Sequence, residues 1–289
     1  MADFTATTAA TWLPEKWSPL ATITERSNTP LWDTFDHRWE PEVVGGGDTV
    51  NIPGFSQNAS ANKRSTFGTA AALSFEAVTE AQSQLLINQM AYKGYRLPVE
   101  LNPQVIANYT PLLVNGIGTA IALQKDTDVG GDNTNGIDSF TTFVGTDNID
   151  ITDDNIVTAM VNLDAQNAPM DSRYFVVSPA SKGSVIKIEP ARNSLYAAVL
   201  GSMNVDKGRG YFGHYMTFDF VESNNLEAGA SGKKNGAYHT EAIAVASQSK
   251  ISIEKDLNIE DGLLLQVVGW ETYGFKKVKD AYGNEVDGK

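Results

Sequence analysis

The chain has 289 residues and a hydrophobic fraction of 42%, which allow a substantial buried core and exclude wholesale disorder. It contains no cysteine, so disulfide bonds, thiolate metal sites and cysteine nucleophiles are excluded. A formal net charge of −13 argues against a protein built to grip nucleic acid, which needs a basic patch to neutralise phosphates. We expect no secretory signal, because the N-terminal residues lack a basic start followed by an apolar run.

Residues 1–43 combine large aromatic side chains with frequent prolines. The prolines exclude one long helix, although a short piece such as Pro30–Trp39 can be helical. Large aromatic side chains are stabilised by burial, so the segment packs either across the main body or on a neighbouring subunit. Of the two, we favour the neighbour. The aromatic residues concerned are Trp12, Trp17, Trp32, Phe35 and Trp39.

Two strands and a long loop are predicted next. Residues 48–53 alternate apolar and polar side chains, as in a half-exposed strand, and Leu73–Ile87 favours a second strand. Between them, Gly54–Ala72 is rich in small and polar residues and reads as a long loop, which is a common feature of functional segments. The resulting hairpin has too few large apolar residues to form a domain. We expect it to lean on another part of the protein or on a partner.

The stretch Leu101–Gln124 has no charged residue and predicts a long helix. Asn102 can cap it and Pro103 suits its first position. Pro111 predicts either a kink or a restart of the helix with Thr110 as the new cap. A membrane span is the alternative, but four polar residues interrupt the stretch and no basic cluster flanks it. We therefore favour a core helix, whose apolar stripe comprises Val105, Ile106, Tyr109, Leu112, Leu113, Ile117, Ala120 and Ile121.

An acidic segment follows, which we interpret as a loop. Residues 126–172 hold ten aspartates and no Lys, Arg or Glu. This pattern favours a solvated face with aspartate-rich turns. The alternative is a calcium loop in which Asp126, Asp128 and Asp132 gather oxygen ligands. The order of ligands, glycine and closing glutamate that an EF-hand needs is missing, so we favour the solvated face.

The second half of the chain predicts helices and strands interleaved without a regular repeat, which is typical of an α+β fold. A helix over Thr152–Asn167 starts at a Thr152 or Asp153 cap and buries Ile156, Met160 and Leu163. A second helix follows Ser178-Pro179 and runs through Val185 and Ile188. The predicted strands are Arg173–Val177, Tyr211–Phe220, Glu241–Ser247 and Leu263–Val278, the last as one long strand or two. Leu195–Leu200 is apolar and Glu227–Gly236 is a turn-rich loop.

No motif predicts an enzyme. Residues Gly208–Gly213 match the dinucleotide fingerprint G-x-G-x-x-G, but a strand-like pattern follows them where the fingerprint needs a helix. We therefore interpret them as a glycine turn that enters a strand. His37, His214 and His239 have no metal-binding spacing. A Ser–His–Asp site assembles in space and is not tested by sequence, but no nucleophile-elbow pattern supports one. We predict no catalytic, cofactor-binding or metal-binding residues.

Four segments, in this order and spacing, carry a resemblance to a known family. They are Gly47-Asp-Thr-Val-Asn-Ile-Pro53, Arg173-Tyr-Phe-Val-Val-Ser-Pro179, Gly213-His-Tyr-Met-Thr-Phe-Asp-Phe-Val-Glu-Ser-Asn224 and Tyr238-His-Thr-Glu-Ala-Ile-Ala-Val-Ala-Ser-Gln248. The chain resembles the major capsid proteins of tailed bacteriophages, which share the Hong Kong 97-type capsid fold. The resemblance covers nearly the whole chain.

The resemblance implies a role for each part. Residues 1–43 would be an N-terminal arm, and residues 44–97 an extended loop that overlaps the adjacent subunit. Residues 98–150 and 237–289 would form a peripheral domain around the spine helix, and residues 151–236 an axial domain. The implied function is structural: many copies form pentamers and hexamers of an icosahedral shell around double-stranded DNA, without sequence-specific DNA binding and without a membrane.

The resemblance also implies partners and a location. A portal and possibly a decoration protein would join the shell in the virion, after assembly in the host cytoplasm. Some family members carry a long N-terminal scaffold segment that is removed; this chain has none, so we expect a separate scaffolding protein. Some members also cross-link a loop lysine to a neighbour's asparagine. Lys63 is the only lysine of Gly54–Ala72, but nothing around it demands that chemistry, so we expect a non-covalent shell.

Two alternative functions stay open at this point. Encapsulin compartments use the same fold and would enclose a protein cargo instead of a genome. A soluble acidic hydrolase belongs to a different class, and would be a monomer or a small oligomer.

Overall fold

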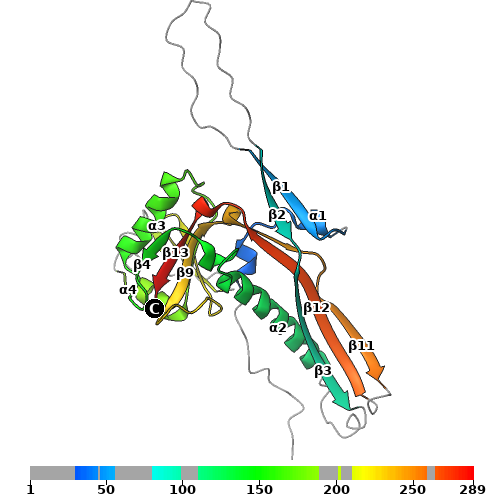
Figure 1. Cartoon of the computed structure of the whole chain (residues 1–289). Helices are drawn as coiled ribbons and strands as arrows, with labels where there is room; N and C mark the ends of the chain where they lie inside the picture. Colours follow the sequence, from blue (N-terminus) through cyan, green and yellow to red (C-terminus); the bar gives the residue numbers. More distant parts are fainter. Residues whose placement is uncertain are drawn as a thin grey trace, which may run out of the picture. The chain divides into compact units, whose positions relative to one another are not determined.

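The computed structural model describes residues 30–44, 46–55, 80–98, 110–188, 201–202, 210–258 and 264–289. Helices and strands are mixed along the chain without a regular repeat, which confirms the predicted α+β class (Figure 1). The chain divides into two compact units. In the described residues, the smaller unit contains 92–98, 110–121, 251–258 and 264–270, and the larger unit contains the rest.

A seven-stranded mixed sheet forms the centre of the larger unit. Its order is β4-β13-β9-β5-β8-β7-β6, so strands that are far apart in sequence lie next to one another. β5 runs parallel to β8 and antiparallel to β9, and β13 runs parallel to β4. The strands are β4 (Phe143–Gly145), β5 (Arg173–Val177), β6 (Gly201–Ser202), β7 (Tyr211–Tyr215), β8 (Phe218–Glu222), β9 (Lys233–His239) and β13 (Gly283–Gly288).

Two helices pack on one face of this sheet. Helix α3 (Asp153–Ala165) begins at Thr152, whose side chain forms a capping box with Asn155, as the predicted cap requires. Helix α4 (Pro179–Lys187) begins at Ser178 with proline in its first turn. Alternate residues of β5 and β8 meet these helices in a fully buried cluster. Its members include Ile156, Leu163, Phe175, Val177, Val185, Phe218 and Phe220.

The opposite face of the sheet is covered by aromatic side chains from distant segments. Tyr238 of β9 is fully buried and stacks on Phe35, with ring centroids 5.0 Å apart. The ring of Phe140 also contacts Tyr238, with centroids 6.2 Å apart. Phe35 belongs to the chain's first described segment, so the expectation that a neighbouring subunit covers this aromatic segment is wrong for Trp32 and Phe35. Trp12 and Trp17 lie outside the described residues.

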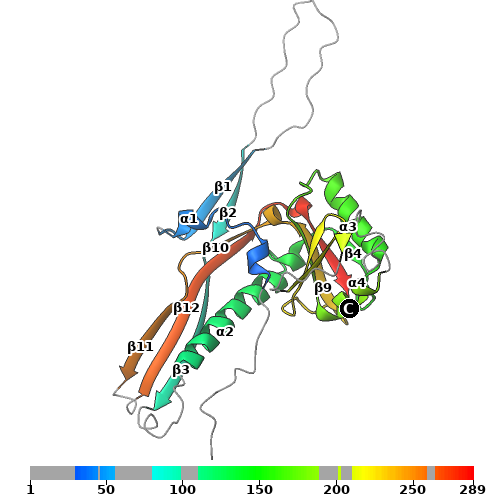
Figure 2. The same ribbon diagram turned by 180° about the vertical axis from the view of Figure 1, so that it is seen from behind.

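The predicted hairpin is confirmed. Strand β1 (Thr49–Phe55) pairs antiparallel with β2 (Glu80–Leu86), with Val50 opposite Leu85 and Ile52 opposite Ser83. One face of the hairpin buries Val50, Ile52 and Leu85 against Ala244 and Ala246 of β10 (Ile243–Ser247). Helix α1 (Glu40–Val43) lies beside the hairpin (Figure 2). Its Val43 side chain belongs to the same cluster. The loop predicted between the two strands lies outside the described residues.

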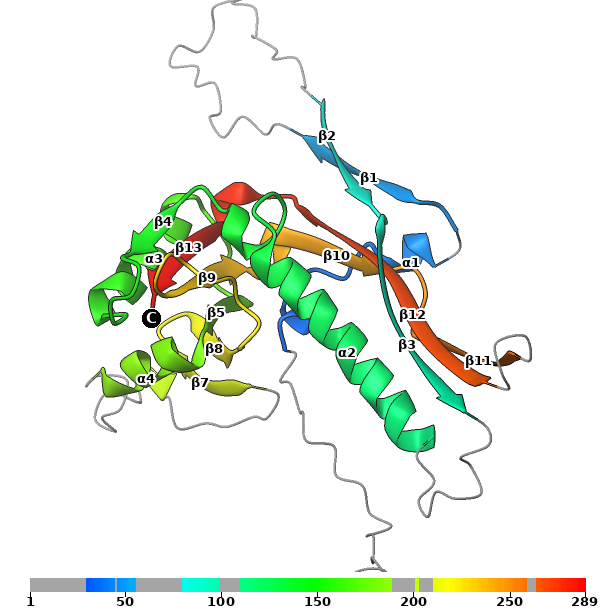
Figure 3. The same cartoon turned by 60° about the horizontal axis from the view of Figure 1, so that its bottom comes forward.

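The smaller unit contains part of a four-stranded sheet and part of one helix. Strand β12 (Leu264–Lys277) pairs with β11 (Ser252–Asn258) over its first half and also pairs with β3 (Gln89–Pro98). Helix α2 (Thr110–Gly131) lies along one face of this sheet (Figure 3). Ile117 of α2 is fully buried and reaches Gly269 so closely that a Cβ there would lie 2.4 Å from its methyl group. Glycine at 269 therefore permits close packing of helix on strand.

Several sequence predictions need correction. The helix predicted to end at Gln124 continues to Gly131, because the charged residues after 124 have buried partners. Its first described residue is Thr110, where a restart was one of two expectations, and residues 101–109 lie outside the description. Tyr211–Phe220 is a hairpin of two strands, since Met216 has a positive φ of 55° and turns the chain. The predicted loop Glu227–Gly236 ends early because β9 begins at Lys233.

Six of the described strands were not predicted, namely β3, β4, β6, β9, β11 and β13. Strands Arg173–Val177 and Leu263–Val278 were predicted with near-correct bounds. No helix in the described part of the chain is both long and apolar enough to cross a membrane.

Candidate functional site

In the larger unit, a buried carboxylate holds the backbone of residues 31 and 32. Asp126 of α2 accepts hydrogen bonds from the backbone nitrogens of Leu31 and Trp32, both at 3.1 Å. The Asp126 side chain is nearly fully buried. Burial raises its pKa to about 6, and the hydrogen bonds from Trp32, Leu31 and Asn225 offset part of that rise. A carboxylate with only neutral donors thus fixes the backbone at Leu31 and Trp32.

The neighbouring residue Lys125 ties the same helix turn to β12. Its ammonium group lies 2.6 Å from Glu271 Oε1 and 3.0 Å from Ser247 Oγ, and all three side chains are buried. The ammonium also lies 4.2 Å from the ring centroid of Trp32, which is a cation–π contact. Trp32 meets Tyr273 edge to face at 5.5 Å. One turn of α2 therefore binds both residues 31 and 32 and strand β12.

The same segment continues into an edge interaction with β10. Thr34 Oγ1 lies 2.7 Å from the hydroxyl of Tyr238. The backbone nitrogen of Asp36 donates to Ile243, and Val245 donates back to Asp36. Residues 31–36 are therefore held by side chains and backbone together, which fixes the point where the preceding part of the chain joins the body.

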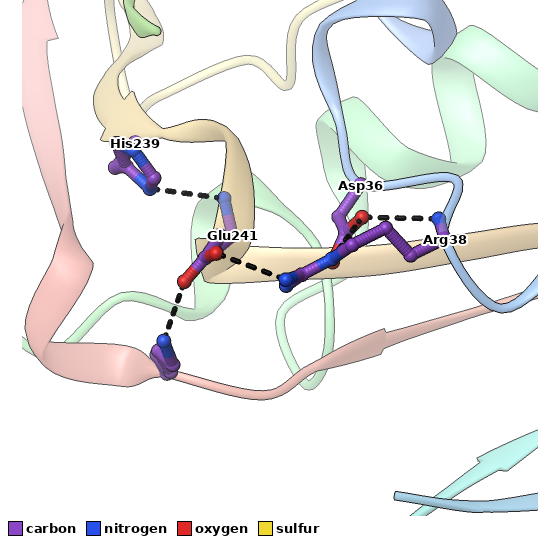
Figure 4. A network of polar contacts seen from close by, with 5 residues as sticks. Asp36, Arg38, His239 and Glu241 are labelled. Carbon is purple, nitrogen blue, oxygen red and sulfur yellow. Dashed lines mark hydrogen bonds and ion pairs between the residues drawn. The ribbon is translucent and has the colours of Figure 1, made fainter. Parts of the chain in front are cut away.

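A cleft of about 320 Å³ lies beside the base of the hairpin. A chain of alternating charges runs along it (Figure 4). Arg38 Nη2 lies 2.8 Å from Asp36, Arg38 Nη1 lies 3.1 Å from Glu241, and Lys279 Nζ lies 2.5 Å from the other oxygen of Glu241. The lining residues are Asp36, Arg38, Trp39, Ile52, Pro53, Ser83, Glu241, Val278 and Lys279.

The electrostatics of this network keep its charged forms in place. The hydrogen bond to Asp36 raises the pKa of Arg38, and the hydrogen bond from Lys279 lowers the pKa of Glu241. Burial lowers the pKa of His239, and its Nδ1 accepts the backbone N–H of Glu241 at 3.2 Å. Each charge is neutralised by a neighbour. The cleft is therefore lined by a satisfied ion-pair network.

The structure does not bring the candidate metal ligands together. Asp126 faces Leu31 and Trp32, Asp128 accepts from Tyr273 and Gln124, and Asp132 accepts from the backbone of the following turn. Within the described ranges, no group of three His, Cys, Asp or Glu side chains could hold a metal ion.

The other sequence candidates are also separate. His37 contacts Glu40 and the Trp32 carbonyl, His214 pairs with Asp219, and His239 lies in the network above. The described part of the glycine fingerprint, Gly210 to Gly213, is a turn that enters strand β7, as predicted. Without a helix after it, there is no N-terminus to meet a pyrophosphate. Lys63 lies outside the described residues.

Sequence reasoning missed the Lys125–Glu271 pair and the Arg38–Glu241 network. These partners are separated by 146 and 203 positions in the chain, and so leave no local pattern. The available signal is Lys125, which follows Ile117 and Ile121 at intervals of four residues and so continues the apolar face of the helix. A charged residue in such a position needs a buried partner.

Comparison with known proteins identifies the fold. No known family model and no curated protein sequence matches the chain. Among solved structures, a chain from Mycobacterium phage Che8 is 20% identical, with a TM-score of 0.74, and the match covers 96% of this chain and 98% of that one. A chain of the capsid of the cyanophage P-SCSP1u is 14% identical, with a TM-score of 0.69 and coverage of 98% and 94%. A chain of the capsid of the native GTA particle is 12% identical, with a TM-score of 0.69 and coverage of 99% of both chains.

These likenesses are over whole chains, not over one motif. The mixed α+β architecture described above is therefore a known fold. That fold is found in chains of phage capsids and of the capsid of a GTA particle.

Proposed function

We propose that this chain is the major capsid protein of a tailed bacteriophage, and that many copies form an icosahedral shell around packaged double-stranded DNA. The observation that carries the proposal is the full-length likeness to capsid chains, which covers at least 95% of this chain and 90% of theirs in the matches to capsid structures. The role is structural and not catalytic. The satisfied charges of the cleft at the hairpin base agree with a role in holding the subunit's shape.

The layout we propose is that of the Hong Kong 97-type capsid fold. Residues 1–43 form the N-terminal arm and residues 44–97 the extended loop. Residues 98–150 and 237–289 form the peripheral domain with α2 as its spine, and residues 151–236 form the axial domain. Two features support this layout: β1 and β2 pair only with each other in the described residues, and residues 31–36 are fixed on the body. A two-stranded hairpin is marginal in water, so a neighbour that covers it would stabilise it.

The partners follow from this role. The subunit associates with itself in pentamers and hexamers, and a separate scaffolding protein, a portal and possibly a decoration protein complete the head. DNA is enclosed without sequence-specific contacts, and the net charge of −13 limits sticking of the wall to phosphates. Assembly takes place in the host cytoplasm and the product is located in the virion.

Electron microscopy and light scattering of the protein, expressed with the scaffolding and portal proteins of its own phage, test the proposal. We expect closed particles of megadalton mass. A stable monomer or dimer under all these conditions would overturn it and would favour a soluble protein such as the hydrolase alternative. Particles that fill with a protein cargo and never with DNA would instead identify an encapsulin-type compartment.

A further inference from the structure

One face of the sheet in the smaller unit is open in the described part of the chain. Val268 lies opposite Glu254 of β11, and its methyl group lies 3.0 Å from where a Cβ on Gly94 of β3 would be. Strand β12 therefore lies between β3 and β11, and these three residues point to the same side. Gly269 and Ile117 mark the other side, which α2 covers.

The open face has a defined composition. Side chains alternate along a strand, so Tyr92 and Arg96 lie on the same face as Gly94, and Asp256 lies on the same face as Glu254. The Tyr92 side chain is 73% exposed, and Arg96, Glu254 and Asp256 are exposed as well. No ion pair joins Arg96, Glu254 or Asp256 to another described residue.

The charges on this face are separated by strand. The β3 edge carries Arg96 beside an exposed tyrosine, and the β11 edge carries Glu254 and Asp256. Both strands pair only with β12 in the described ranges, so each leaves an outer edge of backbone donors and acceptors. Tyrosine and arginine are the residue types enriched where proteins bind one another.

We propose that these two edges are the two halves of a contact between copies of this chain: the β3 edge of one copy lies against the β11 edge of the next. Arg96 then faces Glu254 and Asp256, and Tyr92 supplies the apolar anchor. The contact rests on the proposed shell function and specifies a surface through which the subunits join.

A second copy fits because the charge of the β3 edge is opposite to that of the β11 edge, whereas two β3 edges or two β11 edges carry like charges. A two-fold contact through one edge would place Arg96 against Arg96, or Glu254 against Glu254, and like charges repel. Contact between unlike edges is heterologous, and a heterologous contact repeats from copy to copy until a ring closes. The charges therefore favour rings over dimers.

Charge-reversal variants of the full chain, expressed with the same scaffolding and portal proteins, test this contact. Arg96→Glu makes both edges acidic, and Glu254→Lys with Asp256→Lys makes both edges basic. We expect each variant to reduce particle yield at least tenfold by electron microscopy, with unchanged thermal unfolding of the free subunit. The triple variant has exchanged but again complementary edges, and should recover the yield to within about threefold.

Matched controls lie on the same strands. Lys93→Glu and Lys255→Glu reverse an exposed charge on the face toward α2, and we expect them to leave the yield within twofold of wild type. The two edge variants, mixed as purified subunits, should associate by light scattering although neither does so alone, because each supplies the edge that the other lacks.

The outcomes separate this contact from the shell function. If wild type forms particles and Arg96→Glu assembles equally well, the contact is overturned and the shell function stands. The same holds if the triple variant fails to assemble although its subunit unfolds normally. A wild-type protein that never forms particles would overturn both.

Discussion

The carboxylate of Asp126 holds the backbone of Trp32, with Oδ1 3.1 Å from the Trp32 nitrogen. The other oxygen accepts from the Leu31 nitrogen, so removal of the side chain leaves two buried backbone N–H groups without an acceptor. We expect Asp126→Ala to lower the free energy of unfolding by about 2 kcal/mol, which is the usual cost of unsatisfied buried hydrogen-bonding groups. Urea unfolding at pH 7 measures this. The control is Thr127→Ala on the exposed side of the same helix turn, which should change stability by less than about 0.5 kcal/mol. Equal effects would contradict the role of Asp126.

The same residue predicts a pH dependence. Burial raises the Asp126 pKa from 3.8 to about 6, so between these values the folded chain binds a proton that the unfolded chain does not. This group therefore adds stability as the pH falls from 6 towards 4, with a slope of up to about 1.4 kcal/mol per pH unit. Asp126→Asn keeps the shape without titrating, so the stability of wild type minus that of Asp126→Asn should rise on acidification. A difference that stays flat between pH 7 and pH 4.5 would show that the carboxylate is solvated.

The pair Lys125–Glu271 is buried, so its two single variants should behave differently from the double variant. Lys125→Met leaves the Glu271 carboxylate buried with no cation and should cost about 3–5 kcal/mol. Addition of Glu271→Leu removes that charge and should recover most of the loss, because a well-packed apolar pair replaces a buried ion pair at little cost. Urea unfolding of the four proteins in the cycle gives the coupling energy. Additive effects of the two substitutions would mean that the pair is hydrated.

The elements that sequence predicted well have strong local signals. Helix α3 has a capping threonine and three apolar residues at helical spacing, and β5 is a short apolar run stopped by Ser178-Pro179. Strand β12 alternates over much of its length. In each case the spacing of apolar residues within one short segment indicates which side of the element is buried.

The missed elements lack such a signal for a physical reason. Strand β11 lies at a sheet edge and all seven of its residues are polar or exposed, so no buried apolar face marks it. The acidic segment was predicted to be a loop from Asp126 onward, yet Asp126 and Asp128 are helical. Their hydrogen-bond partners, Trp32 and Tyr273, are 94 and 145 positions away in the sequence, so no local pattern indicates them. The exposed edge charges that we assign to assembly have no described partner within one subunit, so only the fold brings them onto one face.

The last prediction concerns a close approach between β12 and the hairpin. A Cβ on Gly274 would lie 2.1 Å from the carbonyl oxygen of Leu86 and 3.0 Å from the Cα of Ile87, and neither backbone atom can move freely. We expect Gly274→Ala to lower the free energy of unfolding by about 1–3 kcal/mol, because an added methyl group overpacks a tight site. It should also loosen the Leu85 cluster at the hairpin base, which hydrogen exchange of β1 and β2 would reveal. Gly183→Ala is the matched control. It lies inside helix α4 with open space around it, so alanine there should stabilise the protein by about 0.5–1 kcal/mol. If Gly274→Ala were as stable as wild type and assembled normally, the hairpin would not depend on this contact.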